Sequence, residues 1–103
     1  MTTKVSINGY DWTVEPVEEN NPELTERNFG ITLVSSMKIL IRKTLEQQQL
    51  KETLIHELTH AVLHTQGRCY QRKFELEDVC EFVGYCGELI VTLANDIMKG
   101  WGY

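Results

Sequence analysis

Residues 50–67 read LKETLIHELTHAVLHTQG, and their apolar residues recur every three or four positions, which is the clearest structural signal in the chain. One face of the pattern carries the apolar residues Leu50, Leu54, Leu58, Ala61 and Val62. Polar residues fill the opposite face, and Gly67 ends the pattern. The spacing predicts an amphipathic helix whose apolar face packs against the rest of the chain.

A second helical stripe follows this helix after a short basic segment. It runs from Leu76 to about Lys99. Its apolar residues are Leu76, Val79, Cys80, Val83, Ile90, Leu93, Ala94 and Ile97. The sequence therefore predicts a second long helix that packs against the first. Trp101 and Tyr103 follow the second helix. We expect them to pack on the hydrophobic face; the alternative is that they fold back over the cleft that holds the functional site.

Before the helices the apolar period is two, which is typical of strands. From Lys4 to Val14 apolar and polar residues alternate around Asn8-Gly9, a dipeptide that adopts positive φ at little cost, so a hairpin is predicted. Two further strands are predicted at Ile31–Val34 and Met37–Arg42, with Ser35-Ser36 as a turn or bulge between them.

From Glu15 to Pro22, prolines, asparagines and like charges predict an exposed connection between the hairpin and the later strands. The whole chain then predicts an α+β fold, with a small antiparallel N-terminal sheet followed by two long packed helices. With 103 residues and no repeat or linker, residues 1–103 are expected to form a single minimal domain.

Composition excludes several classes of function. The net charge of −5, from 10 Lys and Arg against 15 Asp and Glu, argues against direct nucleic-acid binding. No apolar run approaches the ~20 residues of a membrane span, and no secretory leader is recognisable, so a cytoplasmic location is expected. Cys69, Cys80 and Cys86 follow no paired metal spacing; they are expected to be reduced, with Cys80 and Cys86 in the core.

The first helix carries the run His56-Glu57-Leu58-Thr59-His60, an H-E-x-x-H pattern. Four residues make slightly more than one turn, so both imidazoles leave the same face and can bind one zinc ion at ~2.0–2.1 Å each. Glu57 can reach a water at that ion without being a ligand, which places it as the general base of a hydrolysis. Zinc would bring the pKa of that water toward ~7 and polarise the carbonyl under attack.

Such a site needs a third protein ligand, which the second helix must supply. The candidates are Glu75, Glu77, Asp78, Cys80, Glu81 and Glu88, together with His64 on the first helix. Glu77, Cys80, Glu81 and Gly84 are related by three, four and seven residues and share one helix face. Gly84 would let the two helices approach closely at that face, and simple tight packing explains it equally well.

These residues resemble a known family. His56-Glu57-x-x-His60 followed by Glu77-Asp78-Val79-Cys80-Glu81 is similar to the gluzincin metallopeptidase pattern, and Thr53–His64 resembles the small phage and prophage zinc peptidases of the ImmA/IrrE or minigluzincin kind. The resemblance implies His56 and His60 as zinc ligands, Glu57 as catalytic base, Glu77 as third ligand and Glu81 as an acid that orients a ligating imidazole. The set of three ligands would also be complete if Glu81 were the third ligand and Glu77 the orienting acid.

The resemblance also suggests that the strand Lys38–Arg42 lies at the sheet edge beside the cleft, where an extended peptide pairs with it; an ordinary core strand is the alternative. His64 is expected to be structural or to lie behind the ligands, because a catalytic zinc keeps one position open. The residues that could stabilise the oxyanion are Tyr70, Tyr85, His64 and Arg72, and the sequence does not rank them.

Three functions compete. The leading hypothesis is a zinc-dependent metallopeptidase that hydrolyses peptide bonds of a peptide or protein substrate with Glu57 as base. The alternative is a metal-stabilised interaction protein that binds a regulator, such as a phage or host repressor, without turnover. The third is a helical packing module without metal. Glu57 favours catalysis because a purely structural site needs no carboxylate there and usually has four protein ligands.

Overall fold

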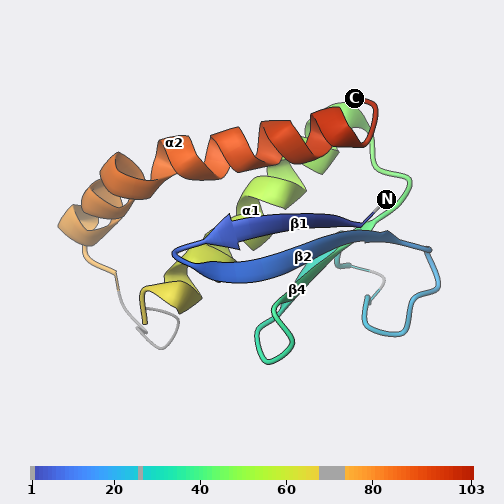
Figure 1. The fold of residues 1–103 in the computed structure, drawn as a ribbon, viewed down its shortest axis with the longest axis horizontal. Helices are drawn as coiled ribbons and strands as arrows, with labels where there is room; N and C mark the ends of the chain where they lie inside the picture. Colours follow the sequence, from blue (N-terminus) through green and yellow to red (C-terminus); the bar gives the residue numbers. More distant parts are fainter. Residues whose placement is uncertain (1, 26, 68–73) are drawn as a thin grey trace.

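The computed structural model describes residues 2–25, 27–67 and 74–103. Its strands are β1 (Thr3–Ile7), β2 (Tyr10–Val17), β3 (Gly30–Leu33) and β4 (Lys38–Arg42), and its helices are α1 (Gln47–Thr65) and α2 (Leu76–Gly100). The strands form one sheet in the order β1-β2-β4-β3, and the helices follow it in the chain (Figure 1). This arrangement confirms the predicted α+β class.

The first hairpin forms as predicted. Asn8 and Gly9 both have positive φ, at 51° and 85°, and β1 pairs with β2 in antiparallel register from Ile7 opposite Tyr10 to Thr3 opposite Val14. The turn between β3 and β4 also lies where it was expected, closed by a hydrogen bond from the Met37 backbone N–H to the Val34 carbonyl oxygen at 3.2 Å.

The prediction of a purely antiparallel sheet is wrong, because β2 and β4 are parallel. β3 and β4 form an antiparallel hairpin, and β4 occupies the place beside β2, so β4 runs in the same direction as β2. The apolar sequence of β4 explains its central place. Ile39 and Ile41 are buried toward the helices and Leu40 is buried on the opposite face, as suits a strand covered on both sides.

Two further expectations about the sheet are corrected. The expected position of Lys38–Arg42 at the sheet edge is wrong, because β4 lies between β2 and β3, and the edge strands are β1 and β3. The expected loop at Glu15-Pro16 is also wrong, because β2 continues to Val17 and Pro16 pairs with Ile41. β1 already ends its pairing at Val14, so β2 has a free side there, where a proline without an N–H is tolerated.

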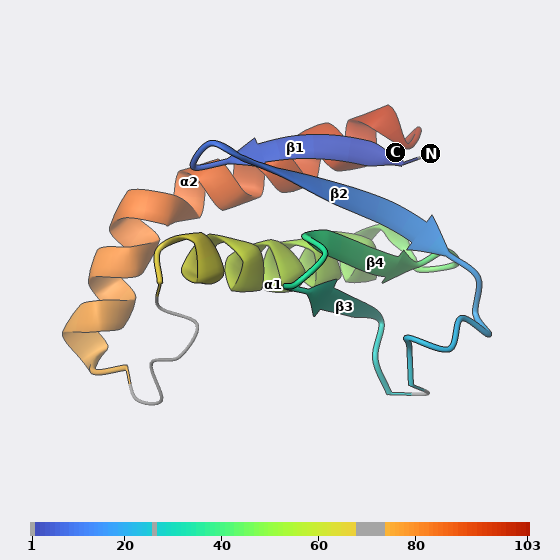
Figure 2. The same cartoon turned by 60° about the horizontal axis from the view of Figure 1, so that its bottom comes forward.

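The main core lies between the sheet and the two helices. It contains Ile7, Trp12, Val14, Ile39, Ile41, Leu54, Leu58, Ala61, Val62, Cys86, Ile90, Ala94 and Ile97, among others. Figure 2 shows α2 beside β1 and α1 beside β4 and β3, so the helices form a second layer across the sheet. A smaller cluster of Val17, Leu24 and Leu40, joined by Ile31 and Leu33, lies on the other face of the sheet.

Polar contacts join α2 and the residues that follow it to the rest of the domain at two places. At one place, the Tyr103 hydroxyl donates to the Leu45 carbonyl oxygen at 3.4 Å, and the indole N–H of the buried Trp101 donates to Thr3 Oγ1 at 2.9 Å. The packing interpretation is therefore confirmed for Trp101, which belongs to the core, whereas Tyr103 is 50% exposed. At the other place, Gln66 Nε2 contacts Cys86 Sγ at 3.1 Å.

Because Gln66 directly follows α1, α2 passes the C-terminal end of α1 at Cys86, and its first turns extend beyond α1. Figures 1 and 2 both show these pale-orange turns projecting past α1. Their apolar residues Leu76, Val79 and Val83 are exposed. The expectation of close helix packing at Gly84 is wrong, because a Cβ there would meet no atom within 4 Å in the part of the chain that the structure describes.

The cysteine expectations hold in part. Cys86 is buried in the core as expected, whereas Cys80 is exposed on the projecting turns of α2, so its expected place in the core is wrong; both are free thiols. Cys69 lies outside the described residues. Within those residues, neither helix has the length and apolar character that crossing a membrane requires.

Candidate metal centre

α1 places the two histidines of the H-E-x-x-H run side by side on its exposed face. The opposite face of the helix is buried through Leu50, Leu54 and Leu58, so the helical period turns His56 and His60 outward. Their ring centroids are 5.0 Å apart and the rings are inclined by 70°. The side chain of His56 is 68% exposed. Two neighbouring, accessible imidazoles fit two ligand positions of a zinc ion.

Glu57 points in a different direction from the two histidines. Its residue exposure is only 7%, which makes it one of the few buried charged residues among those described. Its Oε1 accepts a hydrogen bond from Thr32 Oγ1 on β3 at 2.7 Å, and its Oε2 lies 3.8 Å from His56 Nε2. The carboxylate thus lies between the edge strand and the imidazole pair, as the sequence-based role of a base beside the ion requires.

A groove runs between β3 and α1 along this site. Two adjoining hollows of about 390 and 320 Å³ share Asn28, Gly30, His56 and Glu57 in their walls. The second hollow continues along β3 past Thr32 and reaches His60. The groove is long and open, and it follows the unpaired side of the edge strand.

Gly30 allows β3 to lie this close to α1. A Cβ at Gly30 would come within 3.0 Å of Ile41 Cδ1 and Thr53 Cγ2 and within 3.1 Å of the Leu40 carbonyl oxygen. Real Cβ atoms rarely have such close neighbours, so a side chain at this position would push the strand and the helix apart. Thr32, two residues further along the same face of β3, reaches Glu57 because of this close approach.

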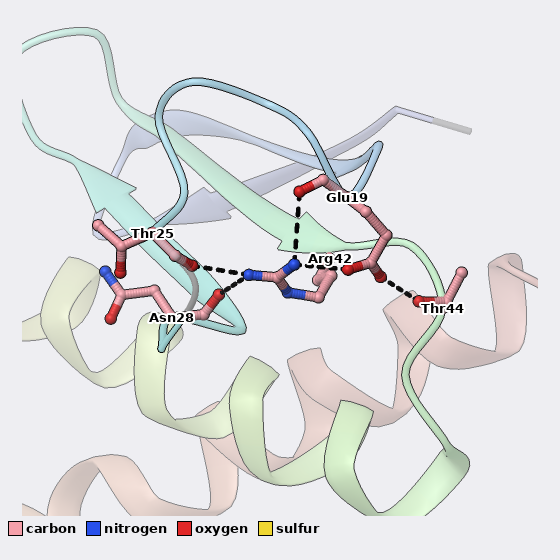
Figure 3. A network of polar contacts seen from close by, with 5 residues as sticks. All are labelled: Glu19, Thr25, Asn28, Arg42 and Thr44. Atoms are coloured by element: carbon pink, nitrogen blue, oxygen red, sulfur yellow. Dashed lines mark hydrogen bonds and ion pairs between the residues drawn. The ribbon is translucent and has the colours of Figure 1, made fainter.

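A network around Arg42, at the end of β4, anchors the connection that leads into β3 (Figure 3). Its Nη2 donates to the carbonyl oxygens of Thr25 at 2.8 Å and Asn28 at 2.7 Å. Its Nη1 pairs with Glu19 Oε2 at 2.5 Å, and the Thr44 hydroxyl donates to Glu19 Oε1. The hydrogen bond from Thr44 and the contact with Arg42 lower the pKa of Glu19 below its ordinary value. The network holds Asn28 in the wall of the groove.

The structure does not bring the acids of α2 to the histidines. Glu77, Cys80 and Glu81 are exposed on the projecting turns. Glu77 precedes Cys86, where α2 passes the end of α1, by nine residues, or about 14 Å of helix. Across residues 2–25, 27–67 and 74–103, no three His, Cys, Asp or Glu side chains gather as a group that could hold a metal ion. The described residues thus provide two imidazoles that could bind zinc and a carboxylate that could act as base. The roles of Glu77 as third ligand and of Glu81 as the acid that orients an imidazole stay predictions.

The candidates for oxyanion stabilisation are separated by the fold. Tyr85 is 80% exposed on α2, and His64 is partly buried with its ring edge-on to Trp12 at a centroid distance of 6.3 Å. The packing against Trp12 agrees with the expectation that His64 is structural. Tyr70 and Arg72 lie outside the described residues.

Sequence reasoning missed three residues that shape the site: Thr32, Gly30 and Arg42. Gly30 stands directly before a strand pattern, where a glycine signals close backbone approach, so this signal was present. Thr32 lies on the same strand face as Gly30 by the period of two, but nothing in the sequence paired that face with Glu57. Arg42 carried no local signal, because the partners of its guanidinium lie 14 to 23 residues earlier in the chain.

Comparisons with models of protein families, with curated proteins and with solved structures give no match to this chain. The candidate centre therefore stands on the geometry of its own residues.

Proposed function

We propose that this protein is a zinc-dependent peptidase in which Glu57 is the general base. The observation that carries the proposal is the arrangement on α1. Two exposed imidazoles lie 5.0 Å apart between ring centroids, and a buried carboxylate beside them faces the same groove. An H-E-x-x-H run on a helix whose glutamate is held in a groove wall favours catalysis over a purely structural ion site.

In this proposal His56 and His60 hold the ion, Glu77 is the third ligand and Glu81 orients one imidazole. When bound, the zinc ion would supply Lewis acidity for the attacking water and the scissile carbonyl. Glu57 takes the proton of that water as the new C–O bond forms, and it delivers a proton to the leaving amine nitrogen as the C–N bond breaks. The same carboxylate thus acts first as base and then as acid.

Glu77 can take part only if the first turns of α2 move toward α1. These turns have little packing to lose, since Leu76, Val79 and Val83 are exposed and Gly84 has open space around it. Movement toward α1 would also bury part of this apolar surface, which favours the closed arrangement.

The proposed substrate is an extended peptide segment that lies in the groove along β3. β3 is an edge strand, so the backbone groups on its outer side are available for strand addition. The groove continues past both Glu57 and His60, which places the backbone of such a peptide beside the proposed base. The resemblance to the small phage peptidases suggests a protein regulator as the source of this segment.

A metal-stabilised interaction protein without turnover is the second candidate. The exposed apolar side chains on the first turns of α2 favour it, because Leu76 is 75% and Val83 is 58% exposed and both suit contact with a partner protein. In that case the protein would bind zinc and a partner, and Glu57 would be dispensable for both.

The Glu57→Gln variant tests the proposal with a peptide-library digest and metal analysis. We expect zinc content to stay at the wild-type level and hydrolysis to fall by roughly 10²–10⁴-fold, the usual contribution of a general base. The matched control is Glu46→Gln, which removes an exposed carboxylate just before α1. Turnover by Glu57→Gln at the wild-type rate would overturn the assignment, and a zinc-bound wild type that cleaves nothing would favour the second candidate.

A further inference from the structure

The contact between Thr32 and Glu57 joins the edge strand to the proposed base. Thr32 Oγ1 lies 2.7 Å from Glu57 Oε1 and 3.2 Å from the Glu57 carbonyl oxygen. The hydroxyl has one proton to donate, and the shorter distance and the charge of the carboxylate favour Oε1 as its acceptor. A carboxylate as buried as Glu57 requires such a partner, because an unpaired buried charge is strongly unfavourable.

This hydrogen bond distinguishes the two carboxylate oxygens. Oε1 is held by the strand, and Oε2 lies on the side of the histidines, 3.8 Å from His56 Nε2. Fixing one oxygen restricts rotation of the planar carboxylate, so the other keeps its direction. In the proposed reaction Oε2 is then the oxygen that must take the proton.

The strand is itself held in place by β4, by its packing on α1 and by an anchor just before it. Gly30 lets it lie against Thr53 on α1, and the guanidinium of Arg42 fixes the carbonyl oxygen of Asn28 just before it. Thr32 therefore projects from a well-supported backbone, as accurate placement of a reacting group demands.

We propose that Thr32 is a positioning residue, whose hydroxyl holds Glu57 Oε1 so that Oε2 faces the site of water attack. This inference rests on the proposed peptidase function. It also gives β3 two tasks, since the strand that would pair with the substrate peptide also orients the base. Substrate and base then share one rigid support, which fixes their separation.

The kinetic test compares three variants. Thr32→Val removes the hydroxyl and keeps the side-chain shape, and it should lower kcat by about 10- to 100-fold with little change in KM or zinc content. Thr32→Ser restores the hydroxyl and should recover most of the activity. Thr13→Val, on β2, is the matched control and should behave as wild type. A Thr32→Val variant with wild-type kcat, or a Thr32→Ser variant as impaired as Thr32→Val, would overturn the proposal.

A readout without activity comes from a double-mutant cycle in urea unfolding. Thr32→Val is combined with Glu57→Met, which removes the acceptor at similar length. We expect the two sites to be coupled by about tenfold in the folding equilibrium constant, or about 1.4 kcal/mol. Coupling below about twofold would overturn the inference whatever the activity. Tenfold coupling in a zinc-bound protein that cleaves no peptide would contradict the proposed function and still support the placement of the carboxylate by Thr32.

Discussion

The histidine pair has two sides, and they differ sharply. On the β3 side, Gly30 and Thr32 lie against α1 and a hydroxyl reaches the carboxylate of Glu57. On the α2 side, Glu77 and Glu81 are exposed on turns that project past α1. The side built on buried strand–helix contacts is formed in the chain alone. The side that depends on the start of α2 has no such contacts, and in our proposal the ion itself completes it.

The same difference appears within α2. Between Cys86 and Met98 one apolar stripe of α2 is buried, formed by Cys86, Ile90, Ala94, Ile97 and Met98. In the first turns the corresponding apolar residues Leu76, Val79 and Val83 are exposed. Helical periodicity is the same in both halves, so an apolar stripe alone does not fix what it packs against. The position of α2 along α1 decides this, since Cys86 contacts Gln66 at the end of α1 and the turns before Cys86 extend past it.

Replacing the acids of α2 tests the α2 side of the histidine pair, and we expect the effect on zinc affinity to be the largest of those predicted here. If Glu77 completes the site, Glu77→Gln should weaken zinc binding on the order of 100-fold and Glu81→Gln by about tenfold, measured by competition with a chelating dye. Asp96→Asn, which replaces an exposed acid of the same helix that is not a candidate ligand, is the control. The reverse order would exchange the two roles, and unchanged affinity in both variants would show that no acid from these turns reaches the ion.

Replacing Gly30 disrupts the β3 side of the histidine pair, where the strand packs on α1. In Gly30→Ala the new Cβ would come within 3.0 Å of Ile41 and Thr53, so we expect a loss of about 1–3 kcal/mol in the free energy of unfolding. Urea denaturation measures this loss. Hydrolysis should fall as well, because Thr32 would be displaced from Glu57. Wild-type stability in this variant would mean that β3 does not lie so close to α1.

The same substitution at Gly84 should change the free energy of unfolding in the opposite direction. A Cβ there meets open space and the backbone is helical, so Gly84→Ala should stabilise the protein by about 0.5–1 kcal/mol. Thermal or urea unfolding without zinc provides the measurement. A destabilised variant would indicate that α1 and α2 approach closely at this position after all, as the sequence had suggested.

The smallest predicted effect concerns the anchor of the groove wall. Because Thr44 and Arg42 lower the pKa of Glu19, its contribution to stability is present above the ordinary value of 4.5 and is lost as the pH falls through its lowered pKa. Urea unfolding at about pH 6 and about pH 3 should show a smaller difference for Glu19→Gln than for wild type. Glu23→Gln on the same connection is the control. Identical pH dependence in wild type and Glu19→Gln would remove Glu19 from the network.

The sequence predicted the parts of this structure that depend on local patterns. The Asn8-Gly9 turn, the periods of the strands and helices and the pairing of His56 with His60 all depend on neighbours within a few residues. The parallel place of β4 and the edge place of β3 could not be predicted in this way. They depend on which strand of a hairpin is the more apolar and docks beside β2, a contact across more than twenty residues.

The candidate site likewise has features that local patterns predict and features that depend on long-range contacts. H-E-x-x-H is a local signal, and its geometry on α1 is as predicted. Thr32 and Arg42 act through long-range contacts that leave no trace in the spacing of residues. The expected meeting of Glu77 with the histidines relied on the two helices being in a particular register. In the structure Gln66, at the end of α1, contacts Cys86, and Glu77 lies nine residues before that point, so its meeting with the histidines stays a prediction.

Elemental analysis of protein purified without chelator measures whether His56 and His60 bind zinc. We expect about one zinc ion per chain in the wild type and none in the His56→Ala and His60→Ala variants, each of which keeps the fold because the replaced imidazole is exposed. A folded wild type that carries no zinc and takes up none on titration would show that the two histidines are not metal ligands.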